Sequence, residues 1–148
     1  MIPYKWSRVS ENIIRFVGVP DEDDGTLWRH YITRTVLEAK SKWSILGKYL
    51  FFSEDWKTLE KLAIQEMEDN GYPTAKIPMD QSKIGKSYVL CLYSKDDSDH
   101  NKLKEKYNNH LQVRYVRWKS DEETKRGAYS QRFLKERSET LAKNKLIK

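Results

Sequence analysis

Cysteine and histidine are scarce in this sequence, which has one cysteine and three histidines in 148 residues. A single cysteine cannot form an internal disulfide, and so few sulfur and imidazole ligands argue against a dedicated metal centre. Cys91 lies in an apolar segment with no histidine at motif spacing, so we expect it to be a small buried hydrophobic residue. No cofactor is expected.

Long apolar runs are also missing. No stretch approaches the roughly 18 residues of a membrane span, and residues 1–10 lack the apolar segment of a signal peptide. We therefore expect a soluble, cytoplasmic protein with no membrane partner. Glycine is sparse, and Gly85-Lys86-Ser87 matches only the end of a nucleotide-binding P-loop, because Asp80 occupies the place of its first glycine. This mismatch excludes nucleotide hydrolysis of the P-loop type.

Aromatic residues are plentiful, with five tryptophans, nine tyrosines and four phenylalanines. Their large buriable rings offset a low aliphatic content, so we expect a folded chain. The length fits one domain over residues 1–148, within which residues 1–40 could form an N-terminal extension or arm.

Positive charge is concentrated in the last third of the chain. Residues 1–100 hold 14 basic and 16 acidic side chains, whereas residues 101–148 hold 14 basic and only 6 acidic ones. The excess favours a polyanionic partner, either RNA or a nucleotide, or else a phosphopeptide or an acidic protein. Residues 140–148 are expected to be a frayed basic tail.

The hydrophobic pattern predicts an α+β fold in which helices cover one face of a sheet. Thr26 is expected to cap a helix that continues through Val36 and Leu37, and Ser53 to cap a second that ends at Asn70-Gly71. A third helix should follow Ser98. Strands are expected at 13–17, 43–52, 74–78, 87–93, 111–119 and 127–131, with the 49–52 part of the second one central in the sheet, and a basic helix at 133–146.

The strand expected at 111–119 combines fixed positive charge with aromatic rings. Cations neutralise phosphates and rings stack on bases, so such a cluster suits single-stranded nucleic acid. Alternation places Val113, Tyr115 and Arg117 on one face and Arg114, Val116 and Trp118 on the other. The alternative is that the rings belong to the core and the arginines extend from it to solvent. The candidate binding residues are Arg114, Arg117, Trp118, Lys119, Lys125, Arg126 and Tyr129.

Two further features belong to this candidate site. The charged loop at 118–127 could fold over a ligand, or it could be an ordinary hairpin loop. Lys76 lies between Ala75 and Ile77, so its ammonium could point toward a phosphate on the open sheet face or into solvent from an edge strand. We favour solvent for Lys76 on the sequence alone.

Three blocks of the sequence resemble the basophilic-leukemia-expressed protein family and its small archaeal relatives. The resemblance covers about residues 40–131. It is carried by Gly47-Lys48-Tyr49-Leu50-Phe51-Phe52 with Trp56, by Val89-Leu90-Cys91-Leu92-Tyr93-Ser94, by Trp118-Lys119-Ser120-Asp121 with Thr124, Gly127 and Tyr129, and by the pair Ala75-Lys76. It implies a fold like that of the messenger RNA cap-binding initiation factor, a curved and mainly antiparallel sheet backed by helices.

Relatives of that family are also described as similar to phosphothreonine lyases. That similarity implies an elimination in which a lysine removes a proton and a histidine assists departure of the phosphate. Lys76 is the lysine we nominate as base, and no histidine of the sequence stands in a recognisable motif. Three hypotheses follow: a module that binds RNA or a nucleotide, a lyase acting on a phosphorylated side chain, and a protein-interaction module with a basic tail.

Overall fold

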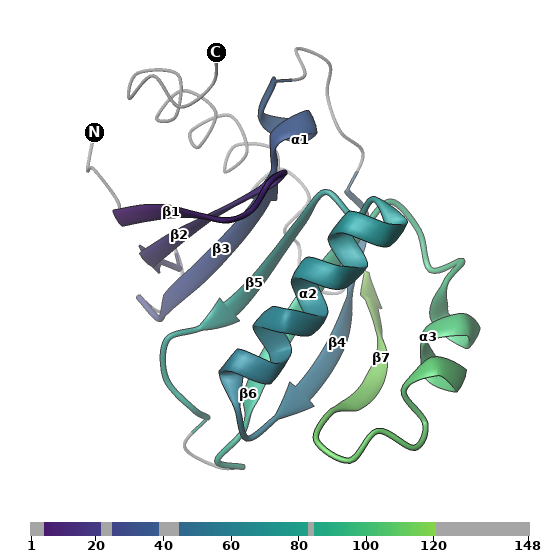
Figure 1. Cartoon of the computed structure of the whole chain (residues 1–148). Helices are drawn as coiled ribbons and strands as arrows, with labels where there is room; N and C mark the ends of the chain where they lie inside the picture. Colours follow the sequence, from purple (N-terminus) through teal and green to yellow (C-terminus); the bar gives the residue numbers. More distant parts are fainter. Residues whose placement is uncertain (1–4, 22–24, 39–44, 83–84, 121–148) are drawn as a thin grey trace.

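The computed structural model describes residues 5–21, 25–38, 45–82 and 85–120. Within these ranges the chain forms seven strands and three helices (Figure 1). The strands are β1 (Lys5–Ser10), β2 (Ile13–Pro20), β3 (Leu27–Thr33), β4 (Gly47–Ser53), β5 (Thr74–Pro78), β6 (Tyr88–Ser94) and β7 (Arg114–Ser120). The helices are α1 (Arg34–Glu38), α2 (Trp56–Asn70) and α3 (His100–Lys106).

All seven strands belong to one sheet in the order β1-β2-β3-β5-β6-β4-β7. Every pair of neighbours is antiparallel. The helix α2 lies across one face, in contact with β4, β5 and β6, and α3 lies beside β7 (Figure 1). We call the face that carries α2 the front face and the opposite one the rear face. The predicted α+β class, with an antiparallel sheet, is confirmed.

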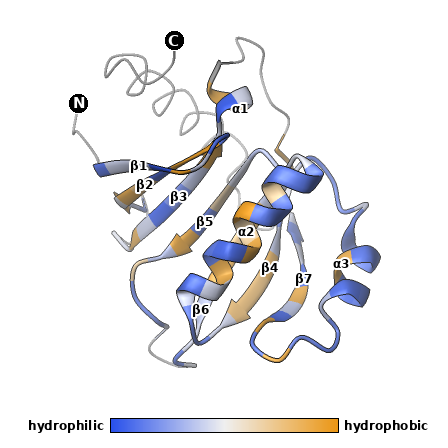
Figure 2. Cartoon of the chain, viewed as in Figure 1, coloured by the Kyte–Doolittle hydropathy of each residue, from blue (hydrophilic) through white to orange (hydrophobic). Residues whose placement is uncertain are grey.

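The main core lies between α2 and the front face. Side chains alternate along each strand, so residues paired in register share a face. Tyr49 pairs with Leu92 and Phe51 with Leu90, and all four side chains are fully buried. They pack against the apolar positions of α2. Figure 2 shows hydrophobic residues, in orange, along the helix and on the strands behind it. The helix contributes Leu59, Leu62, Ala63 and Met67.

The helix α2 begins and ends close to the expected residues. Asp55 is its N-cap and accepts the backbone N–H of Lys57, while the Ser53 hydroxyl accepts the N–H of Asp55 instead of capping the helix. Gly71 ends it with φ of 72°, a left-handed conformation that glycine adopts without steric cost. Among the helices described, including this longest one of 15 residues, none is both long and apolar enough to cross a membrane.

The helix expected to start at Thr26 is wrong, because Leu27–Thr33 forms strand β3. Its residues are mostly aromatic or β-branched, and from Arg29 onward all are buried, which suits a strand with neighbours on both sides. The strand pairs with β2 and β5. The helical turn starts only at Arg34, where the Thr33 hydroxyl accepts the N–H of Val36.

Most of the described residues among the first 40 thus belong to the sheet. They form β1, β2 and β3, which make up one side of it, and the short helix α1 (Figure 1). The sequence had also allowed an extension or arm for this part of the chain.

Candidate functional site

A β-bulge in β7 interrupts the alternation of its side chains between the two faces of the sheet. Tyr115 pairs with Phe51, but Arg117 pairs with the adjacent Leu50, which leaves Val116 as an extra residue. The extra residue shifts the alternation, so Tyr115 and Trp118 both face the front. The prediction that Tyr115 shares a face with Arg117, and Trp118 one with Arg114, is wrong.

Both of these rings pack into the core. The Trp118 ring centroid lies 4.8 Å from that of Tyr49, and the Tyr115 centroid lies 5.0 Å from that of Phe51. Gly47 allows the close approach of Trp118, because an added Cβ would collide with the ring and come within 2.6 Å of the Lys119 carbonyl. Burial raises the pKa of Tyr115. Trp118 therefore lies among core aromatics, on the opposite face from the basic residues of β7.

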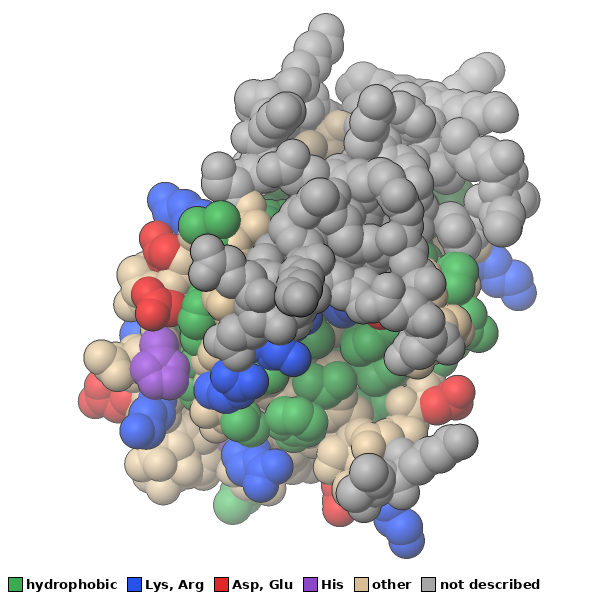
Figure 3. Space-filling view, turned by 180° about the vertical axis from the view of Figure 1, so that it is seen from behind, with side chains coloured by type: hydrophobic (Ala, Val, Ile, Leu, Met, Phe, Trp, Pro, Cys, Tyr) green, Lys and Arg blue, Asp and Glu red, His purple; other side chains and the backbone are tan. Residues whose placement is uncertain are grey.

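Four basic side chains gather on the rear face of β4 and β7. Lys119 pairs directly with Lys48, Arg117 with Leu50, and Arg114 with Phe52. We call Lys48, Arg114, Arg117 and Lys119 the cationic strip. Figure 3 views the molecule from behind and shows Lys and Arg side chains beside an apolar area on this face.

The cationic strip contains an unusual pairing of like charges. Cross-strand partners have Cβ atoms about 4.5–5.5 Å apart, and like charges placed this way destabilise a sheet. Among the described residues, no carboxylate lies within 4.0 Å of the ammonium of Lys48 or Lys119 or of the guanidinium of Arg114. An anion bound from outside would relieve the repulsion.

Aromatic rings border the cationic strip. The Arg114 guanidinium lies 5.7 Å from the ring centroid of Phe52, and the Lys48 ammonium lies 5.6 Å from that of Tyr93. The sequence alone did not identify Lys48, Phe52 or Tyr93 as residues of the candidate site. The alternation of β4 was the available signal, since Lys48 and Phe52 fall between the front-facing residues of that strand.

Lys76 lies further along the rear face, in an interior strand. Its strand β5 pairs with β3 and β6, so the interpretation as a solvent-facing lysine of an edge strand is wrong. Lys76 is 7% exposed, with its ammonium 3.9 Å from a carboxylate oxygen of Asp21 and 4.2 Å from a Trp28 ring centroid. The Tyr93 centroid is 5.9 Å from the same ammonium, which connects Lys76 to the end of the cationic strip at Lys48.

His30 stands directly opposite Lys76 on β3. Both residues are buried on the rear face, with 5% and 7% exposure. The sequence could not reveal this pairing while residues 27–33 were expected to be helical. Lys125, Arg126 and Tyr129, together with the strand expected at 127–131, the helix at 133–146 and the tail, lie outside the described residues.

Comparison of the chain with protein-family models, with curated proteins and with solved structures finds no match.

Proposed function

We propose that the chain is a binding module that recognises a phosphorylated ligand, RNA or a nucleotide, on its rear face. The observation that supports this most is the direct pairing of Lys48 with Lys119, with Arg114 and Arg117 on the same face. Such a concentration of positive charge on two adjacent strands is matched by the phosphates of a polyanion.

The aromatic rings beside the cationic strip favour a nucleic acid over a simple anion as the ligand. The rings of Phe52 and Tyr93 lie beside the cations, and proteins that bind single-stranded nucleic acids use such rings for base stacking. A fold like that of the cap-binding factors, as the sequence resemblance implies, would likewise leave one sheet face for ligand. We propose that this chain has a fold like that of the cap-binding factors.

Replacing Lys119 or Arg114 with alanine should weaken binding of a short single-stranded RNA and reduce its salt dependence. Each lost phosphate contact reduces the magnitude of the negative slope of log Kobs against log salt concentration by about 0.7 to 1. The measurement is a fluorescence titration at several salt concentrations, with the chain's tryptophans as reporters. Lys61→Ala is the matched control, since Lys61 is exposed on α2, over the front face.

Unchanged slopes in both variants would contradict this assignment of the site. RNA binding that is lost equally in Lys61→Ala would point to non-specific attraction by net charge. Binding of an acidic protein through the cationic strip, without any affinity for RNA, would favour the protein-interaction alternative.

The pairing of His30 with Lys76 supports a second candidate function, the lyase. In the elimination, Lys76 would take the proton from Cα of a phosphothreonine while the Cβ–O bond breaks and His30 protonates the departing phosphate. A Cα=Cβ double bond forms, and no oxidant or reductant is needed. Desolvation at this buried position would favour the neutral, basic form of Lys76, whereas the nearby Asp21 favours its charged form.

The lyase predicts that Lys76→Met abolishes release of phosphate from a phosphothreonine peptide and leaves peptide binding in place. Mass spectrometry detects the dehydrated product directly. Circular dichroism must show that the variant is folded, because Lys76 is buried. Phosphate release at the parental rate by the folded variant would exclude Lys76 as the base.

A further inference from the structure

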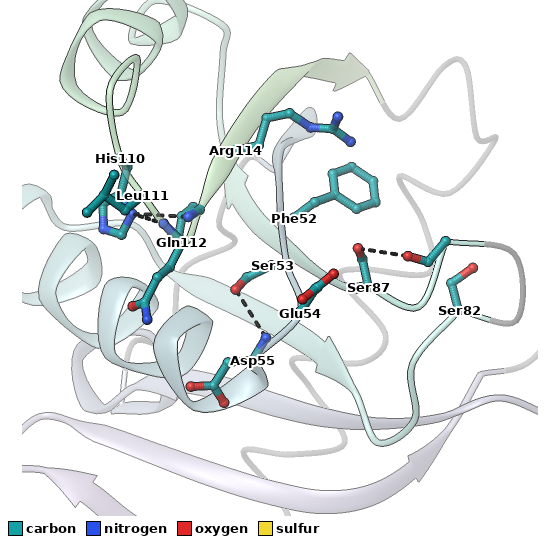
Figure 4. Close-up of a pocket in the computed structure, with 12 residues that line it drawn as sticks. Phe52, Ser53, Glu54, Asp55, Ser82, Ser87, His110, Leu111, Gln112 and Arg114 are labelled. Carbon is teal, nitrogen blue, oxygen red and sulfur yellow. Dashed lines mark hydrogen bonds between the residues drawn. The ribbon is translucent and has the colours of Figure 1, made fainter.

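A pocket lies where the cationic strip meets the end of β4. Its volume is about 720 Å³, which is within the range of about 300–1,000 Å³ typical of small-molecule sites. Three segments line it: the end of β4 with the start of α2, the connection before β6, and the connection from α3 into β7 (Figure 4). Phe52 and Arg114 line the pocket and also pair in register across β4 and β7, so the pocket and the cationic strip are continuous.

One wall of the pocket carries hydrogen-bond donors. His110 Nδ1 accepts the backbone N–H groups of Gln112 and Val113 at 3.1 and 3.0 Å. A neutral His110 therefore carries its proton on Nε2, which can donate to a ligand. Gln112 is exposed, and its side-chain amide offers a second donor together with an acceptor.

The lining of the pocket also includes an acidic group and an aromatic ring. The Glu54 side chain is exposed and pairs with no described cation. It lies next in sequence to Ser53, and Figure 4 shows it between Gln112 on one side and Ser82 and Ser87 on the other. A carboxylate here disfavours a phosphate and favours N–H donors. Phe52 adds an aromatic surface next to the Arg114 guanidinium.

We propose that this pocket holds a nucleobase of the ligand whose phosphates lie on the cationic strip. Every nucleobase has at least one N–H donor for Glu54, ring nitrogens or carbonyls for His110 and Gln112, and a flat face for Phe52. In this arrangement the phosphate lies near the positive charge of Arg114 on the cationic strip. The base lies inside the pocket, where it meets hydrogen-bonding groups and an aromatic ring. This inference rests on the proposed function and extends it from charge attraction to recognition of the base.

The test compares the four nucleoside 5′-monophosphates with ribose 5-phosphate, which has the same sugar and phosphate but no base. Two-dimensional NMR of the full chain follows the Gln112 side-chain amide as the reporter of the pocket and the Arg114 Nε–H as the reporter of the cationic strip. We expect both reporters to shift with nucleotides, only Arg114 to shift with ribose 5-phosphate, and nucleotides to bind at least about 5-fold more tightly.

Variants in the pocket should remove the preference for the base. Gln112→Ala and Glu54→Gln should bring the nucleotides closer to ribose 5-phosphate in affinity, whereas Gln65→Ala, at an exposed position of α2, should leave the difference unchanged. In Glu54→Gln, the side-chain amide of Gln112 is still present and remains the reporter of the pocket. Arg114→Ala should weaken the binding of nucleotides and of ribose 5-phosphate by the same factor.

The outcomes separate the two proposals. Equal affinity for nucleotides and ribose 5-phosphate, with shifts at Arg114 alone, overturns the nucleobase pocket and leaves the proposed function standing. Nucleotide shifts at Gln112 without any at Arg114 support the pocket and contradict phosphate binding on the cationic strip. An absence of shifts at both reporters with millimolar nucleotide overturns both.

Discussion

Replacing Glu66 with alanine is expected to lower the free energy of unfolding by about 2 to 4 kcal/mol. Glu66 is 1% exposed on the buried side of α2. One carboxylate oxygen accepts the Lys106 ammonium and the Tyr107 hydroxyl, both at 2.5 Å, and the other accepts the Asn70 amide at 2.7 Å. Truncation leaves the Tyr107 hydroxyl without its acceptor and creates a cavity where α2 meets the residues that end α3.

Urea unfolding followed by circular dichroism measures this change. Asp69→Ala is the matched control, because it removes an exposed acidic side chain a few residues further along the same helix. We expect the control to change the stability by less than about 0.5 kcal/mol. A similarly small effect of Glu66→Ala would mean that Tyr107 and Lys106 find other partners or water.

The same carboxylate makes stability depend on pH. Burial would raise the pKa of Glu66, but the hydrogen bonds and the charge of Lys106 and Tyr107, with Asn70, outweigh it and hold the pKa below its ordinary value. The ionised group therefore stabilises the fold above the unfolded pKa near 4.5, and this contribution is lost as pH falls through the lower folded pKa. Between pH 6 and 3, Glu66→Gln should lose less stability than the parent chain.

Local signals account for the elements that the sequence predicted well. The apolar positions of α2 recur at helical spacing and Gly71 ends it, and both features depend only on neighbouring residues. The strand β4 was expected to be central because Tyr49, Leu50, Phe51 and Phe52 are apolar on both faces. It does lie between β6 and β7.

The errors arose where distant partners decide the structure. Residues 27–33 have a weak helical spacing of apolar positions, but hydrogen bonding to β2 and β5 and burial on both faces make them a strand. Propensity could not show this, because β5 begins more than 40 residues after β3 ends.

The candidate site was predicted in composition but not in arrangement. The sequence identified Arg114, Arg117 and Lys119, yet it combined them with Trp118, which the bulge in β7 places on the other face. A one-residue bulge has no reliable sequence signature, and it reverses the face of every residue beyond it. The partners of Lys76, Asp21 and Trp28, are likewise about 50 residues away along the chain.

Reversing the charge of Lys119 is expected to have the largest effect on ligand binding. Lys119→Glu removes one phosphate contact and adds a repulsive carboxylate beside Lys48, at that end of the cationic strip. The affinity for single-stranded RNA at low salt should fall by more than about 10-fold, and the salt slope by more than in Lys119→Ala. Lys61→Glu makes the same change of net charge over the front face and should have a much smaller effect.

Folding stability should move in the opposite direction. Glutamate at position 119 would face Lys48 across the two strands, so repulsion is replaced by attraction, and the free energy of unfolding should rise by about 0.2 to 1 kcal/mol. A variant that is more stable but binds poorly indicates that the lysine pair is kept for its ligand at a cost in stability. If Lys119→Glu lowers the stability and leaves RNA binding intact, the pair has a structural role and the cationic strip is not the binding site.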